Sequence, residues 1–194
     1  MNETSPDRLA AGFAQAVQKG DWPAALKLAE ALEIALPGNA GAVYNKALVL
    51  RELGRHDERI ATLRQALEID AGHANAGFEL ASALMEQGEA GEASGLFAAY
   101  LNAVPDDTDA RLNLGNCLVR LGRADEALPH LRAAHIAAPS EATVAALATA
   151  LRDTGDLDAC ETLLAELPET PEAAALRLKV LTQGARGRIS LKTA

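Results

Sequence analysis

Glycine recurs in this sequence at a nearly fixed interval of 34 residues, and proline follows the same period. A constant period of 20 to 50 residues is typical of repeat architectures, in which one supersecondary unit is copied along the chain. The residues that carry the period are Gly20, Gly54, Gly88 and Gly122, then Gly155 after 33 residues, with Pro105 and Pro139 34 apart.

Between these glycines, apolar residues recur at helical spacing. In 110–121, Leu114, Leu118 and Leu121 fall at i, i+4 and i+7, and a second run with the same spacing follows Gly122. Glycine suits the left-handed position that ends a helix, and Pro139 stops the second helix before Ser140, a good N-cap. Each unit is therefore predicted to be helix, tight turn, helix and short loop.

The composition favours stacked helix pairs. Aromatic residues make up only 3% of the chain and alanine is abundant, which argues against an all-β fold. One helix pair cannot bury its apolar stripe alone, but stacked pairs can. We expect alanine to allow close helix approach and larger residues to fill the gaps, at Ala47, Ala66, Ala81, Ala93, Ala127 and Ala134, and at Leu63, Phe97, Leu131 and Leu164.

These positions resemble the tetratricopeptide repeat family, whose 34-residue pattern places apolar or small residues at positions 4, 7, 8, 11, 20, 24, 27 and 32. The stretch 108–141 departs from this pattern only at Arg111, while the other repeats depart at several positions. We expect the charge of Arg59 to snorkel outward. The matches in 108–141 are Leu114, Gly115, Leu118, Ala127, Leu131, Ala134 and Pro139, and the departures elsewhere include Lys46, Arg59, Ala71, Gly77 and Tyr100.

The resemblance implies an all-α fold, an α-solenoid of stacked antiparallel helix pairs known as a TPR superhelix, with about five repeats and a C-terminal capping helix. One array is expected over 1–183, and a helix polar on one side can cover its open end. We expect the basic stretch 184–194 to be a flexible tail. The repeats are predicted at about 6–39, 40–73, 74–107, 108–141 and 141–168, and the capping helix at 171–183.

The resemblance also implies a concave groove lined by the first helix of each pair. Asparagine at its sixth position, Asn45 and Asn113, has both donor and acceptor groups for a peptide backbone, although Glu79 and Ala146 interrupt this ladder. The expected peptide-binding residues are Tyr44, Asn45, Leu48, Arg51, Asn75, Phe78, Glu79, Ser82, Met85, Asp109, Leu112, Asn113, Asn116, Arg120, Thr149 and Arg152.

Charge and motifs exclude several other functions. The net charge of −9 is −13 over residues 1–171, which disfavours nucleic acid, and no uncharged run is long enough for membrane insertion. We find no phosphate-binding glycine loop and no HExxH or GxSxG motif, so neither catalysis nor a cofactor is predicted. The histidines lack metal-ligand spacing, and Cys117 and Cys160 fall at small core positions.

The leading hypothesis is a non-enzymatic, cytoplasmic scaffold of bacterial type that binds a peptide or helix of another protein. One alternative is the N-terminal region of a larger bacterial enzyme, because such repeats commonly precede transferase or hydroxylase domains. Another is self-association through the open ends of the stack.

Overall fold

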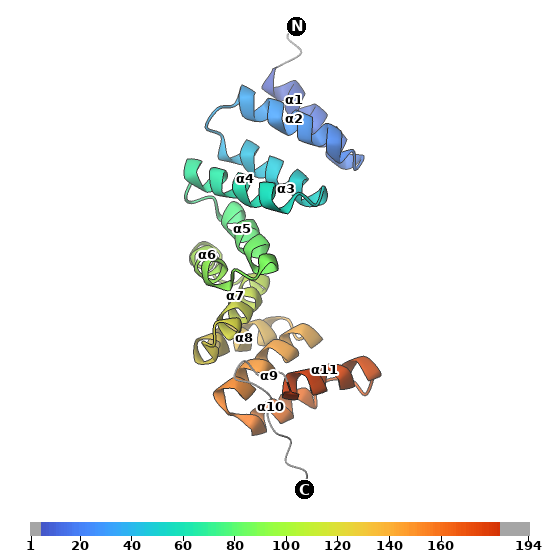
Figure 1. Ribbon diagram of the computed structural model, residues 1–194, viewed down its shortest axis with the longest axis vertical. Coiled ribbons are helices and arrows are strands. Elements are labelled where there is room, and N and C mark those ends of the chain that lie inside the picture. Colours follow the sequence, from blue (N-terminus) through green and yellow to red (C-terminus); the bar gives the residue numbers. More distant parts are fainter. Residues whose placement is uncertain (1–4, 183–194) are drawn as a thin grey trace. The chain divides into compact units, whose positions relative to one another are not determined.

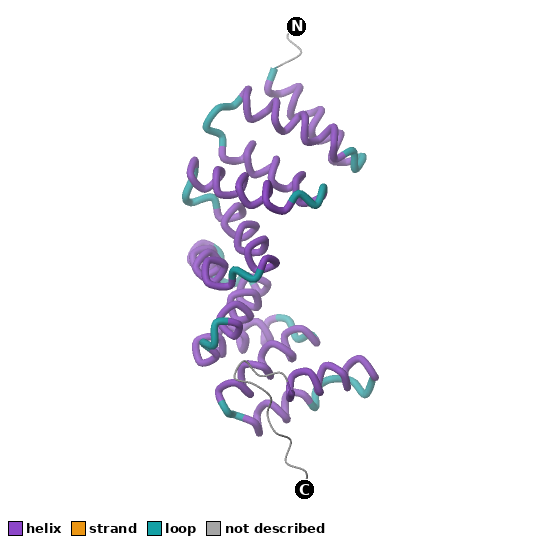
Figure 2. Tube along the Cα trace, viewed as in Figure 1, coloured by secondary structure: helices purple, strands orange, loops and turns teal. Residues whose placement is uncertain are grey.

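The computed structural model describes residues 5–182, and every regular element in that range is an α-helix (Figures 1 and 2). The expected tail 184–194 lies outside the described residues. The helices are α1 (Pro6–Gln18), α2 (Trp22–Ala35), α3 (Ala40–Glu52), α4 (His56–Ile69), α5 (Ala74–Gln87), α6 (Ala90–Ala103), α7 (Thr108–Arg120), α8 (Ala124–Ala137), α9 (Glu141–Thr154), α10 (Leu157–Leu164) and α11 (Pro171–Thr182).

The helices follow the period of the sequence. The first helix of each predicted repeat begins at residue 6, 40, 74, 108 or 141, where the pattern places the repeat start. The second helix has 14 residues in the first four repeats, but α10 has only 8 and ends before Pro168. The all-α fold built from helix pairs is therefore confirmed. We call α1, α3, α5, α7 and α9 the first helices.

The chain divides into two compact units, with the boundary between Gln87 and Gly88. The N-terminal unit contains α1 to α5, in which each helix packs against the next. The C-terminal unit contains α6 to α11, in which α7 and α9 also pack directly and α11 packs on α9 (Figure 1).

None of the helices in 5–182 has the length and apolar character needed to cross a lipid bilayer.

Local chemistry sets the ends of the helices. Gly122 and Gly155 have φ angles of 72° and 90°, a left-handed conformation that only glycine adopts without strain, as predicted. Ser140 caps α9 as expected, and its partner Thr143 completes a capping box. Asp107 caps α7 by accepting from the Ala110 amide at 2.8 Å. The same carboxylate accepts from Tyr100 at 3.0 Å, which gives a reason for a tyrosine at a position where the family has a small residue.

At the crossing of α7 and α8 a small residue packs against a large one. A Cβ atom added to Gly115 of α7 would lie 2.3 Å from Cδ2 of Leu131 in α8, a side chain with no exposed surface. An alanine at this position would therefore force Leu131 to shift. Phe97, Leu63 and Cys160 are likewise fully buried at core positions predicted from the repeat.

The expectation for Arg59 was wrong, because its charge does not snorkel outward. Its side chain in α4 is only 3% exposed, and its guanidinium faces α5. Nη2 donates to Oε2 of Glu79 at 2.9 Å, and Nη1 donates to Oε2 of Glu86 at 3.3 Å. Burying a charge is costly unless it is paired, so Arg59 is stable at a position that normally holds alanine because Glu79 lies opposite.

The Gly115→Ala variant is expected to be destabilised by about 1 to 3 kcal/mol, because the added methyl overpacks the crossing of α7 and α8. Gly95→Ala is the matched control, since Gly95 is exposed within α6 and has no atom within 4 Å of an added Cβ. Alanine should stabilise that helix slightly, by about 0.5 to 1 kcal/mol. Thermal denaturation followed by circular dichroism measures both. A Gly115→Ala variant as stable as the wild type would contradict the packing.

The Glu79→Ala variant is expected to be destabilised by on the order of 3 kcal/mol, because it removes the main partner of a buried guanidinium. Glu86→Ala removes the other carboxylate, which is 56% exposed, and should cost less than about 1 kcal/mol. Urea denaturation of the two variants gives the comparison. Equal losses of stability would show that Arg59 does not depend on Glu79.

Candidate functional site

The predicted groove residues lie on four first helices, in two groups. Those on α3 and α5 form one face of the N-terminal unit, which we call the α3–α5 face, and those on α7 and α9 form the α7–α9 face of the C-terminal unit. The first group is Tyr44, Asn45, Leu48, Arg51, Asn75, Phe78, Glu79, Ser82 and Met85, and the second is Asp109, Leu112, Asn113, Asn116, Arg120, Thr149 and Arg152.

An ion-pair network joins α3, α4 and α5 at the α3–α5 face. Oε1 of Glu79 accepts from Nη1 of Arg51 at 2.7 Å, while Oε2 accepts from Arg59. The Glu79 carboxylate is thus shared by two guanidinium groups and is only 15% exposed. We conclude that Glu79 serves to link helices at this face, whereas Arg51, 42% exposed, remains accessible to a ligand.

Aromatic residues border this network. The ring of Tyr44 lies 5.0 Å from that of His73, measured between centroids. Partial burial and the nearby charge of Glu79 raise the pKa of Tyr44, while Arg51 opposes the change. Nδ1 of His73 also accepts from the Ala76 amide at 3.2 Å, so the histidine caps α5. This role was not predicted from the sequence, where the histidines were considered only as metal ligands.

The remaining side chains of the α3–α5 face are half-buried, apart from exposed Asn75. The hydroxyl of Ser82 donates to the Phe78 carbonyl within its own helix, at 3.0 Å. The amide of Asn45 makes no hydrogen bond with any residue in 5–182. A half-buried amide in this condition has a donor and an acceptor free for a ligand.

A groove of about 270 Å³ lies along the α7–α9 face. Three alanines of α9 form much of its lining, and their small side chains leave the hollow. The groove is lined by α7, α9 and α11. From the sequence, α11 was expected to cap the end of the stack, and no contact with the groove was predicted for it. The lining residues are Asn116 and Val119 of α7, Ala142, Ala145, Ala146, Thr149 and Arg152 of α9, and Leu176, Lys179 and Val180 of α11.

Arg152 lies beneath α11, although it was expected on an open groove. Its side chain is 2% exposed, and Nη1 donates to the Val180 carbonyl. Nη2 donates to Oδ1 of Asp153 at 2.7 Å. The structure therefore uses Arg152 to hold α11 on α9, and little of this side chain is available to a ligand.

The other predicted residues of the α7–α9 face differ in exposure. Leu112, Asn113, Asn116 and Thr149 are half-buried, whereas Asp109 and Arg120 are exposed. Thr149 donates its hydroxyl to the Ala145 carbonyl at 2.7 Å. The amides of Asn113 and Asn116 have no hydrogen-bond partner in the described part of the chain. Both units thus present half-buried, unpaired amides on their first helices.

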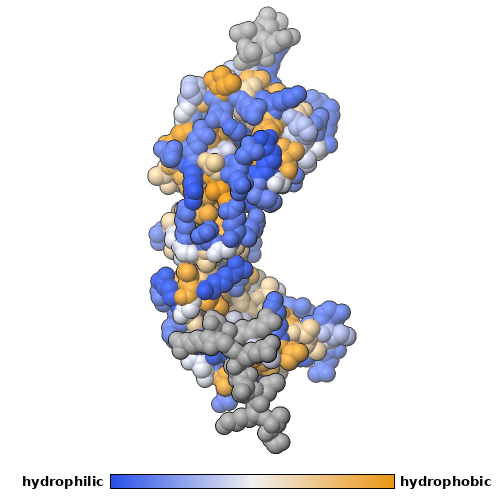
Figure 3. All heavy atoms as spheres, in the orientation of Figure 1, coloured by the Kyte–Doolittle hydropathy of each residue, from blue (hydrophilic) through white to orange (hydrophobic). Residues whose placement is uncertain are grey.

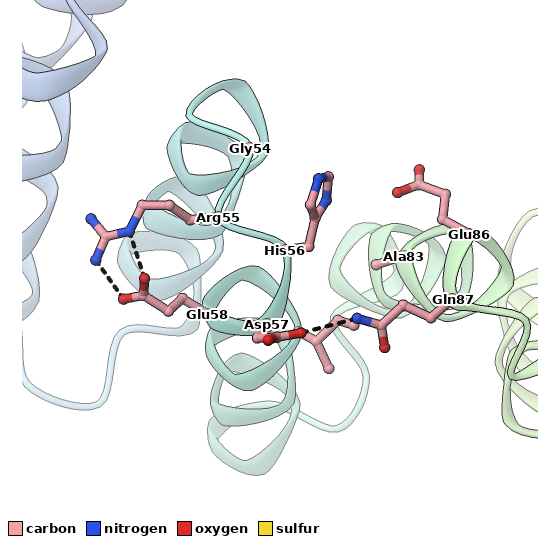
Figure 4. Close-up of a pocket in the computed structure, with 9 residues that line it drawn as sticks. Gly54, Arg55, His56, Asp57, Glu58, Ala83, Glu86 and Gln87 are labelled. Carbon is pink, nitrogen blue, oxygen red and sulfur yellow. Dashed lines mark hydrogen bonds and ion pairs between the residues drawn. The ribbon is translucent and has the colours of Figure 1, made fainter.

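A second cavity, about 570 Å³, lies between the α3–α4 turn and the end of α5 (Figure 4). Its polar groups are largely paired with one another. Nε of Arg55 donates to Glu58 at 2.6 Å, and the Gln87 amide donates to Asp57 at 3.1 Å, as the dashed lines show. No motif predicted this cavity, and its charged groups are not arranged around one point.

The described residues offer no centre for metal or thiol chemistry. Nowhere in 5–182 do three or more histidine, cysteine or acidic side chains come together in a way that suits a metal ion. Cys117 and Cys160 are fully buried, and burial raises the pKa of both thiols. A buried thiol with a raised pKa is a poor nucleophile. The visible surface of each unit mixes apolar and polar residues (Figure 3).

Comparison with solved structures shows the same fold in several proteins of low sequence identity. A crystal structure of the MamA protein is 19% identical and has a TM-score of 0.77, covering 92% of this chain and 94% of that one. YrrB, described as a TPR protein with an unusual peptide-binding site, is 16% identical with a TM-score of 0.78, covering 91% and 89%. A tetratricopeptide repeat protein from Parabacteroides merdae is 19% identical with a TM-score of 0.78, covering 92% and 73%.

Comparison of the sequence itself gives the family. No protein of curated function matches it significantly. A family model described as tetratricopeptide repeat matches residues 15–74 and 78–142, which is more than half of the chain. The matched segments contain the periodic glycines and the helix pairs described above. This protein therefore belongs to the tetratricopeptide repeat family.

Proposed function

We propose that this protein is a non-enzymatic interaction scaffold that binds a peptide or helix of another protein on its first helices. The observation that carries the proposal is the set of half-buried asparagine amides, Asn45, Asn113 and Asn116, that have no partner within 5–182. These amides are free of partners within the described chain, and a peptide backbone supplies both a donor and an acceptor for them.

The surroundings of these amides support the same function. Tyr44, Leu48 and Phe78 provide half-buried apolar surface on α3 and α5, the helices of the same face as Asn45. The groove of the C-terminal unit combines the Asn116 amide with alanines of α9, which leave room for a bulky ligand side chain. Apolar anchors beside a few polar groups are the usual composition of protein interaction sites.

The Asn45→Ala, Asn113→Ala double variant should bind partner proteins about ten-fold or more weakly, at roughly 1 kcal/mol for each hydrogen bond lost. Partners retained by the immobilised full chain are quantified by mass spectrometry for both proteins. Asn102→Ala is the matched control, because Asn102 is an exposed asparagine on the second helix α6. If the double variant and the control retain the same proteins equally, these two amides do not bind partners.

A further inference from the structure

The last helix, α11, is packed as a first helix of a sixth repeat. In each preceding first helix from α3 onward, the third and tenth residues are buried, as Thr143 and Ala150 are in α9. The corresponding residues of α11 are Ala173 and Val180, which are 0% and 4% exposed. Since α11 packs on α9, it continues the order of the first helices within the C-terminal unit.

The outward face of α11 differs from the matching face of α9. In α9 this face is Val144, Leu147, Ala148 and Leu151, all of which are buried. In the described residues, no second helix follows α11 to cover it. The corresponding residues of α11 are Ala174, Arg177, Leu178 and Leu181. Ala174 is exposed, Leu178 is 60% exposed, and Arg177 and Leu181 are half-buried.

A cavity of about 360 Å³ adjoins this face, between α10 and α11. Its apolar lining comes from Leu164, Ala165 and Leu181, and its acidic groups are Glu161 and Glu169. Arg177 also lines the cavity, and its guanidinium forms hydrogen bonds with backbone carbonyl groups. Nε donates to the Leu164 carbonyl at 3.0 Å, and Nη2 donates to the Leu167 carbonyl.

The cavity therefore presents apolar surface beside an excess of negative charge, with two carboxylates and one guanidinium in its lining. Neither Glu161 nor Glu169 forms an ion pair with a residue in 5–182. The C-terminal unit as a whole is acidic, with 15 acidic and 10 basic side chains over residues 88–194. A positively charged partner is complementary to this surface.

We propose that the outward face of α11 and its adjoining cavity bind a basic amphipathic helix of a partner protein, which occupies the place of a second helix. The apolar residues of this face, Ala174, Leu178 and Leu181, recur at i, i+4 and i+7, which is the spacing of residues on one helix that contact a second helix. Second helices of this chain show the geometry required, with small residues flanking a large one, as Ala127, Leu131 and Ala134 do in α8. This surface is separate from the groove of the α7–α9 face, and the inference does not rest on the proposed function.

The probe is a fluorescent, helix-stapled peptide of 14 residues, the length of α8. It carries Ala, Leu and Ala at the spacing of Ala127, Leu131 and Ala134, with lysine and arginine at its other positions. A second peptide, the acidic twin, has glutamate in place of those basic residues and is otherwise identical. Fluorescence polarisation with the full chain should show the twin binding at least ten-fold more weakly, with a difference that shrinks as salt is added.

Leu178→Asp is expected to weaken binding of the basic peptide at least ten-fold, because it places a charge at the centre of the apolar contact. Ala99→Asp is the matched control, since it adds the same charge at an exposed position of α6 outside the cavity and should leave affinity within two-fold. Glu169→Lys should also weaken binding, whereas Asp125→Lys, at an exposed acid of α8 outside the cavity, should not. Circular dichroism checks that each variant is folded.

The proposal is overturned if Leu178→Asp and Ala99→Asp bind the basic peptide equally, or if the acidic twin binds as tightly as the basic peptide. Light scattering of the peptide-free chain tests a different occupant. A dimer that forms with rising concentration and is lost in Leu178→Asp would assign this face to a second copy of the chain, and would also overturn the proposal.

Discussion

The close approach of paired helices is the constraint on which the rest of the structure depends. At the crossing of α7 and α8, Gly115 allows Leu131 to pack where a single methyl group would collide with it. The large residues at the same repeat position, Leu63, Phe97 and Leu164, are likewise buried in both units. Because interiors are close-packed, these contacts fix how each helix lies on the next and hence which residues of the first helices reach the surface.

Two neighbouring repeats satisfy this constraint by different means. Arg59 occupies a position that suits alanine, and Glu79 occupies a position where asparagine is typical, so each departs from the repeat pattern. In the structure they are partners, and Arg51 completes the network from α3. The pairing explains both departures together. It also makes this part of the α3–α5 face rigid, because one carboxylate ties three helices.

Much of the fold was predictable because it is set by local chemistry. Helix starts, turn glycines such as Gly155 and the cap at Ser140 depend on neighbours within a few residues, and the sequence displays them directly. The pairing of Arg59 with Glu79 was not predictable, since it depends on a contact across 20 residues between separate helices. The role of Arg152 was missed for the same reason, because only the packing of α11 on α9 reveals that it is covered. The groove residues on the first helices could be named, but their unpaired amides could be recognised only from coordinates.

The central claim is that partner proteins bind on the first helices while the second helices provide support. Hydrogen–deuterium exchange of the full chain, with and without a captured partner, tests it most directly. The account predicts slower exchange on ligand binding in α3, α5, α7 and α9, with α2, α4 and α8 little changed. Protection confined to α2, α4 and α8 would contradict it.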